Sequence, residues 1–209
     1  MSGARPILFS APMVRAILEG RKSQTRRLVR DAAVAVPDGD HEHIFTAADP
    51  VFGEEATRHL RCPYGAPGDR LWVKEAIRRD GAWSVYDADG ALTAADAWPW
   101  QRNRLPGMFC PRGLSRLLLE VTAVRVERLQ DISEEDARAE GLPLPEDVPC
   151  RITRDGVTEM GTARFFSPLA GFVNLWDSIN AKRAPWDSNP WCWVVEFKRN
   201  LPQEGDDGE

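Results

Sequence analysis

Apolar residues in this chain occur in short segments separated by turn residues, and this pattern limits the folds open to it. Apolar and polar side chains that alternate with a period of two are typical of strands. Strand-like segments lie at residues 6–9, 27–29, 70–76, 83–86, 116–121, 123–129 and 191–197, and helical patterns at 12–19, 133–141 and 172–180. Many short strands and few helices predict an α+β fold, a small mixed β-barrel rather than a doubly wound parallel sheet.

Local signals indicate where these elements begin and end. Gly20 and Gly141 follow helical patterns, where a left-handed residue commonly stops a helix. Ser133 is placed to cap the second helix, and acids fill its first turn. Pro67 and Gly68 fit the central positions of a type II turn. Along the last helix, one apolar face is expected to hold Phe172, Leu175, Trp176 and Ile179.

Composition and hydropathy narrow the class of protein. Hydrophobic residues make up 43% and charged residues 28% of the 209-residue chain, as in ordinary globular domains. No apolar run approaches the roughly 20 residues that span a bilayer, and the run at residues 7–9 is too short for a signal peptide. We therefore expect a cytoplasmic protein with no membrane partner.

Cysteine spacing and the motif inventory argue against metals and cofactors. Four widely spaced cysteines favour free thiols, and a zinc site built from all four would lack the usual close-spaced ligand pairs. These cysteines are Cys62, Cys110, Cys150 and Cys192. The chain also lacks a Gly-x-Gly-x-x-Gly motif, a Walker lysine loop and a His-Glu-x-x-His motif. We expect no cofactor and no metal.

Two stretches without clear periodicity separate the strand-like segments. Residues 31–60 are interpreted as an inserted loop with a helical turn near 54–60, and residues 143–164 as a second insertion. Residues 201–209 carry four acids and no base, a pattern typical of a disordered acidic tail. The sequence thus predicts one domain over residues 1–200 with two insertions.

A strongly basic motif lies next to the first predicted helix. Residues 1–30 hold seven basic side chains and one acid, although the whole chain has a formal charge of −5. Four of these cations surround a hydroxyl residue within residues 20–27. Such a local reversal of sign suggests a site for an anionic ligand such as a nucleotide or nucleic acid. A solvated basic loop explains the charge equally well.

The order of these segments resembles the ASCH family, in the long form common in phages and prophages. Four anchors carry the resemblance and span nearly the whole chain in order. They are residues 8–9 with ILEGRKSQTRR at 17–27; PGDRLWVKE at 67–75; LEVT at 119–122 with LQDISEEDARAEG at 129–141; and LWDSIN at 175–180 with NPWCWVVEF at 189–197.

The resemblance implies a PUA-like β-barrel with a cleft for a nucleic acid or a nucleotide. Small relatives with amidohydrolase activity on N-acylated cytidine use a lysine, a threonine and a glutamate. Matched residue by residue, these fall on Lys22, Thr25 and Glu140. This chain is about twice as long as those enzymes, so its insertions could cover or reshape the cleft.

Elementary chemistry is compatible with this set. A threonine hydroxyl becomes a useful nucleophile only when a base takes its proton. Lys22 could be that base if the neighbouring cations Arg21, Arg26 and Arg27 lowered its pKa. Glu140 could hold the lysine or move protons to the leaving amine. The alternative interpretation is that Thr25 caps a turn and Lys22 is an exposed cation.

Other residues of the anchors are candidates for holding a ligand. Arginines suit phosphates and base carbonyls, and tryptophans can stack on bases. The candidate ligand-binding residues are Arg21, Arg26, Arg27, Trp72, Lys74, Glu75 and Trp193. The tryptophans could equally belong to the core, and Lys74 with Glu75 could be an ordinary pair in the barrel wall.

Three functions remain open on the sequence. The first is a module that binds RNA or a modified nucleoside such as a cytidine derivative. The second is an amidohydrolase that deacylates N-acylated cytidine through Lys22, Thr25 and Glu140. The third, with less support, is a metal-independent ribonuclease that uses Lys22 and the nearby arginines.

Overall fold

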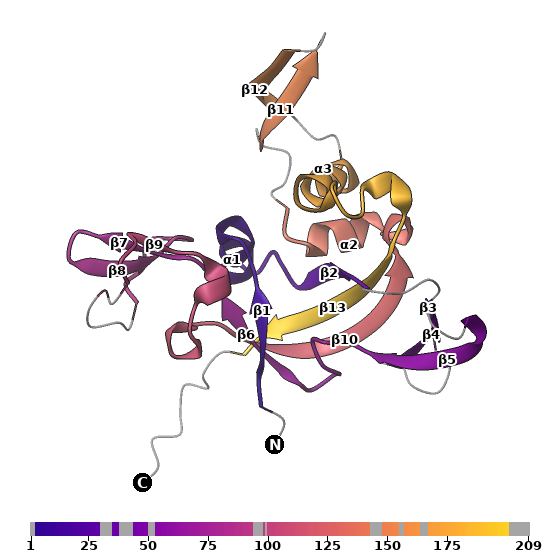
Figure 1. Ribbon diagram of the computed structural model, residues 1–209. Helices are drawn as coiled ribbons and strands as arrows, with labels where there is room; N and C mark the ends of the chain where they lie inside the picture. Colours follow the sequence, from indigo (N-terminus) through magenta and orange to yellow (C-terminus); the bar gives the residue numbers. More distant parts are fainter. Residues whose placement is uncertain are drawn as a thin grey trace.

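A computed structural model describes the fold. Side chains are described for residues 3–29, 61–93, 98, 100–142 and 167–200, and the backbone also for 35–37, 44–49, 53–60, 148–154 and 157–163. Within these ranges the chain is a mixed α+β protein that is rich in strands (Figure 1). No helix in the described ranges has both the length and the apolar character needed to cross a membrane.

A five-stranded sheet in the order β1-β6-β10-β13-β2 forms the centre of the fold. β1 and β6 pair in parallel, and the other pairs are antiparallel. β10 is bulged between Val121 and Ala123. The bounds are Arg5–Leu8 for β1, Gln24–Leu28 for β2, Arg70–Lys74 for β6, Leu118–Arg128 for β10 and Trp191–Arg199 for β13. β1 and β2 form the two edges, and the pairings of the described residues do not close the sheet into a barrel.

The remaining elements surround this sheet. The helices are α1 (Ala11–Leu18), α2 (Glu134–Ala139) and α3 (Pro168–Asn180), with short 3-10 turns η1 (Gly107–Phe109), η2 (Arg112–Leu114), η3 (Leu129–Asp131) and η4 (Trp186–Ser188). A small sheet of β7 (Ile77–Asp80), β8 (Trp83–Tyr86) and β9 (Arg104–Leu105) forms an arm at the end of the molecule opposite α2 and α3 (Figure 1).

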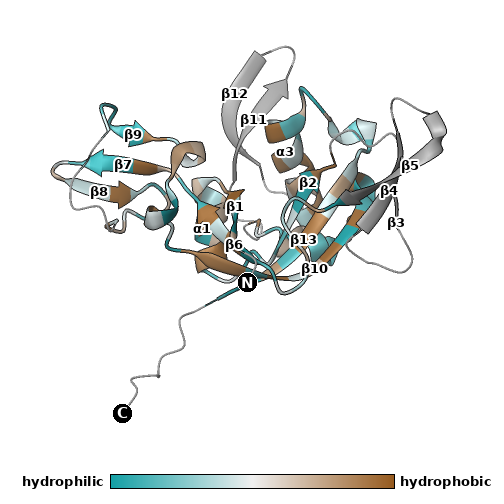
Figure 2. Ribbon diagram, turned by 60° about the horizontal axis from the view of Figure 1, so that its bottom comes forward, coloured by the Kyte–Doolittle hydropathy of each residue, from teal (hydrophilic) through white to brown (hydrophobic). Residues whose placement is uncertain are grey.

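One face of the central sheet is buried, and the other is buried where α2 and α3 cover it. One face carries the main core, which includes Phe9, Ile17, Leu71 and Val195, and it packs against α1. The other face is covered by α2 and α3, whose core is built around Phe172, Trp176 and Cys192. Hydrophobic residues accordingly concentrate where α1 meets β1, β6 and β10 (Figure 2). This burial makes the sheet a rigid support for residues at its edge.

Most of the predicted element ends are confirmed. Gly20 and Gly141 have φ of 75° and 81°, the left-handed conformation that stops a helix. The Ser133 hydroxyl accepts the Asp136 N–H at 3.0 Å and caps α2. Gly68 has a φ of 89°, and the Asp69 N–H donates to the Ala66 carbonyl at 2.9 Å, as a type II turn requires.

Both predicted insertions contain strands, and the helical turn expected in the first was wrong. A helical turn was expected near residues 54–60, but residues 53–61 form the strand β5 (Gly53–Arg61). β5 pairs with β4 (Ile44–Asp49), and β3 (Ala35–Pro37) completes that sheet. The second insertion contains a hairpin of β11 (Val148–Arg154) and β12 (Val157–Ala163). In segments whose sequence has only a weak preference for helix or strand, pairing with a neighbouring strand decides the structure. The rest of both insertions and the tail at 201–209 lie outside the described residues.

Two smaller expectations also need correction. Residues 116–121 and 123–129 were expected as two strands, but one strand, β10, runs through both because the bulge absorbs the irregularity. Ile179 was assigned to the buried face of the last helix, but its side chain is 59% exposed. It lies in the last turn of α3, whose fully buried side chains are Phe172 and Trp176.

Replacement of Trp193 should test whether this residue belongs to the core. Trp193 is 3% exposed within the main core, whereas Trp83 is 65% exposed on the arm. We expect Trp193→Ala to lower the free energy of unfolding by about 3–5 kcal/mol, and Trp83→Ala to change it by no more than about 0.5 kcal/mol. Urea denaturation measures both, and equal effects would contradict the assignment of Trp193 to the core.

Candidate active site

The ends of two helices meet at the free edge of β2. After α1 the chain turns at Gly20, and the backbone N–H groups of Arg21 and Lys22 both donate to the Ala16 carbonyl, at 2.9 and 3.0 Å. At the end of α2, Lys22 forms an antiparallel bridge with Glu140, and the Ser23 N–H donates to the Ala139 carbonyl at 2.9 Å. Residues about 118 positions apart are therefore fixed side by side.

Lys22 and Glu140 form a buried ion pair at this junction. Their Nζ and Oε2 atoms lie 2.8 Å apart, and the residues are 3% and 4% exposed. Lys22 Nζ also donates to the carbonyl oxygens of Gln24 at 2.7 Å and of Glu140 at 2.9 Å. The three acceptors match the three N–H donors of an ammonium group. The pair that the family resemblance implied is thus in direct contact.

The other carboxylate oxygen of Glu140 is bound by backbone. Oε1 accepts the Arg26 N–H at 2.7 Å. The ion pair therefore satisfies the Gln24 carbonyl and the Arg26 N–H at the outer edge of β2, where a neighbouring strand would otherwise bind. A carboxylate at the C-terminal end of a helix is unfavourable without a partner. For Glu140, the partners are Lys22 Nζ and the Arg26 N–H.

Burial dominates the electrostatics of Lys22. Desolvation lowers the pKa of Lys22 below its ordinary value of 10.5, and the nearby Arg27 and Arg26 lower it further. Glu140 opposes this shift, because a negative neighbour favours the ammonium form. The direction agrees with the prediction from sequence, but the main cause is burial rather than the neighbouring cations.

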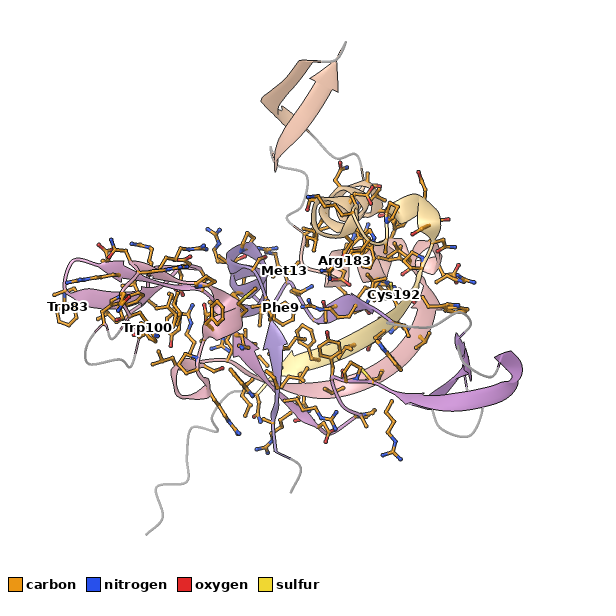
Figure 3. All side chains as sticks on the ribbon, viewed as in Figure 1. Phe9, Met13, Trp83, Trp100, Arg183 and Cys192 are labelled. Atoms are coloured by element: carbon orange, nitrogen blue, oxygen red, sulfur yellow. The ribbon has the colours of Figure 1, made fainter. Side chains whose placement is uncertain are left out.

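Thr25 lies on the face of β2 that points into the main core. It pairs with Val195, and Arg27 pairs with Trp193 on the same face. The Phe9 ring links this face to the ion pair, because Lys22 Nζ lies 5.6 Å and Arg27 Cζ 5.2 Å from its centroid. Figure 3 shows Phe9 in the interior beside β1. Thr25 is 3% exposed.

Arg26, one of the predicted ligand residues, is paired with two carboxylates. Its side chain is fully buried on the opposite face of β2, where Nη2 donates to Glu127 and Asp136, each at 3.0 Å. Its guanidinium carbon lies 5.9 Å from the Phe172 ring centroid. The alternation of side chains along a strand explains why Arg26 and Arg27 point to opposite faces.

Arg21 and Arg27 remain near the ion pair. Arg21 is partly exposed; it binds Glu19 and donates to the Gly141 carbonyl at 2.6 Å. Arg27 Nη2 donates to the Leu8 carbonyl at 2.6 Å, and its guanidinium lies 6.0 Å from the Tyr64 ring. Arg27 Nε is buried and has no hydrogen-bond acceptor among the described residues. Gln24 Nε2 and the Nε and Nη1 atoms of Arg26 are likewise buried donors without a hydrogen-bond partner among the described residues.

The other predicted ligand residues lie elsewhere. Trp193 is buried in the core, so its ring does not offer a stacking face. Lys74 lies 5.7 Å from the Trp72 ring and donates to the Met108 carbonyl. Glu75 is 1% exposed and pairs with Arg116 at 2.9 and 3.0 Å, rather than with Lys74. The predicted set is therefore divided between two regions.

Sequence reasoning missed two residues that shape the site. Phe9 was assigned only to a strand, although its ring lies between Lys22 and Arg27. Gly141 was assigned only as a helix stop, but a Cβ there would lie 2.5 Å from Lys22 Cβ and 2.9 Å from Ala16 Cβ. The position of Gly141 directly after Glu140 is the sequence signal that could have indicated its close approach to Lys22. Among the described residues, no group of three His, Cys, Asp or Glu side chains could hold a metal.

A side chain at position 141 should displace Lys22. Gly141→Ala adds the collision with Lys22 to the strain of a positive φ, whereas a Cβ at Gly20 meets nothing within 4 Å. We expect Gly20→Ala to lower the free energy of unfolding by about 1–2 kcal/mol and Gly141→Ala by about 1–3 kcal/mol more. Guanidinium denaturation of both variants measures the difference, and equal losses would show that Lys22 is not held by this contact.

A double-mutant cycle should measure the buried pair. We expect Lys22→Met and Glu140→Gln each to cost about 3–5 kcal/mol of stability, because each leaves a buried polar partner uncompensated. The double variant should cost much less than the sum. The exposed pair Arg21–Glu19 is the control, and its cycle should give about 0–1 kcal/mol. Additive effects at Lys22 and Glu140 would contradict the coupling.

A scan against protein-family models, a search of curated proteins and a search of solved structures each returned no match to this chain. A function is therefore inferred from the contacts around Lys22, Thr25 and Glu140.

Proposed function

We propose that this protein is an amidohydrolase that removes the acyl group from the exocyclic amine of an N-acylated cytidine, with a PUA-like barrel of the ASCH type as its scaffold. One observation carries the proposal. Lys22 and Glu140, which are far apart in the sequence, form a buried contact of 2.8 Å beside the strand that bears Thr25. Buried ionisable groups with shifted pKa values are concentrated at functional sites.

The proposed reaction begins with proton transfer inside the ion pair. Lys22 becomes a base when one of its protons moves to Glu140 Oε2 along the 2.8 Å contact, and the lowered pKa of Lys22 favours this neutral form. The neutral amine takes the Thr25 proton as the Thr25 oxygen bonds to the acyl carbon. The carbon–nitrogen bond then breaks, and the leaving amine receives a proton from the Lys22–Glu140 pair.

Water completes the cycle. It attacks the acyl group on Thr25, the Thr25 oxygen regains a proton, and a carboxylic acid leaves. The net reaction consumes one water and yields the acid and cytidine. All three side chains are buried, so we expect substrate binding to displace neighbouring side chains such as the half-buried Tyr64.

Arg27 and the rings beside it support binding of a nucleoside. The unused Arg27 Nε–H is a donor for a carbonyl oxygen of the base. Phe9 and Tyr64 lie 5.2 and 6.0 Å from the Arg27 guanidinium, so the ligand would bind beside aromatic surface.

The RNA-binding alternative has less support from the geometry. Its motivation was the basic motif, but Glu127 and Asp136 neutralise Arg26, and Glu19 pairs with Arg21. The ribonuclease alternative would use the same lowered pKa of Lys22, so substrate choice separates it from deacylation. Incubation with RNA in EDTA tests that alternative directly.

Substitution of Thr25 tests the proposal. Absorbance follows deacylation of N4-acetylcytidine by wild-type protein, Thr25→Ala, Thr25→Ser and the control Thr122→Ala, which alters an exposed threonine on β10. We expect Thr25→Ala to lose at least about a hundredfold in kcat/KM and the other two variants to remain active. Full activity in Thr25→Ala would refute the mechanism.

A further inference from the structure

A cavity of about 400 Å³ lies on the face of β6 that points away from the main core. Leu71 and Val73 are fully buried in that core, so Trp72 between them points outward. Leu118 pairs with Trp72 across the strands, and Asn200 donates its backbone N–H to the Leu118 carbonyl at 2.9 Å. Trp72, Leu118 and Asn200 all line the cavity, whose volume is in the range of small-molecule sites.

Arg116 forms a rigid wall of this cavity. Its guanidinium binds both carboxylate oxygens of Glu75, at 2.9 and 3.0 Å, and both of Asp89, at 2.8 and 3.0 Å. It also lies 3.9 Å from the Tyr86 ring centroid. These contacts neutralise its charge and fix its position, so Arg116 supplies shape rather than a free charge.

Arg112 supplies the free charge. It lies in η2, lines the cavity and is exposed. In the described part of the chain, the ion pairs at this cavity are formed by Arg116 and not by Arg112. Lys74, whose ammonium lies 5.7 Å from the Trp72 ring, adds a second cation nearby. The cavity thus combines an aromatic ring, an unpaired guanidinium and the amide of Asn200.

We propose that this cavity binds a nucleoside monophosphate, with the base stacked on Trp72 and the phosphate held by Arg112. An aromatic ring provides stacking for any base, and an unpaired guanidinium suits a phosphate. The side-chain amide of Asn200 has both a donor and an acceptor for the edge of a base. This site shares no residue with Lys22, Thr25 and Glu140, so it does not depend on the proposed hydrolase activity.

Isothermal titration calorimetry at low ionic strength tests the proposal with the four ribonucleoside 5′-monophosphates. Trp72→Ala should weaken binding by about 5- to 100-fold, since stacking is lost, and Trp72→Phe should keep most of the affinity. Arg112→Ala should weaken binding at least about fivefold. The controls Trp83→Ala and Arg138→Ala, which alter an exposed tryptophan and an exposed arginine elsewhere, should bind like wild type.

Titrations with the separate parts of the nucleotide complete the test. Nucleosides without phosphate, and inorganic phosphate alone, should each bind more weakly than the nucleotide. Arg112 is exposed, so its variant remains informative even if Trp72→Ala fails to fold. The proposal is overturned if wild type binds no monophosphate at millimolar concentration, if phosphate alone binds as tightly as the nucleotide, or if Arg112→Ala binds like wild type.

Discussion

The buried contact between Lys22 and Glu140 joins the parts of the structure on which the candidate site depends. It connects the turn after α1, the end of α2 and the edge of β2, and it uses every donor of the lysine. Two charges out of water are costly unless all their hydrogen bonds are made. The same contacts that make the pair stable also place a base with a lowered pKa next to the strand that carries Thr25.

The two candidate sites lie on opposite faces of the central sheet. The core face presents Thr25 and Arg27, and Lys22 contacts the Phe9 ring of the same core. The outward face of β6 presents Trp72 beside Arg112. Side chains alternate between the two faces along a strand, so the neighbours Arg26 and Arg27 point to opposite faces. Basic residues of one sequence motif therefore need not bind the same ligand. Arg26 is instead a structural link to Glu127 and Asp136.

Local features could be predicted from the sequence, and features that depend on distant pairing could not. Glycines with positive φ and the Ser133 cap are determined by nearby residues, so Gly20, Gly68 and Gly141 were assigned correctly. The partnership of Lys22 with Glu140 came only from a family resemblance. Strand β5 was missed because only its pairing with β4 defines it, and the burial of Trp193 depends on which face α1 covers.

The way in which Glu140 and Lys22 bind the edge of β2 also bears on solubility. An unpaired strand edge is a template on which a second molecule can add a strand, and proteins protect such edges with charges or covering segments. Here one ion pair binds the Gln24 carbonyl and the Arg26 N–H of that edge. The groups to which we assign chemistry therefore also guard this edge against intermolecular β-pairing.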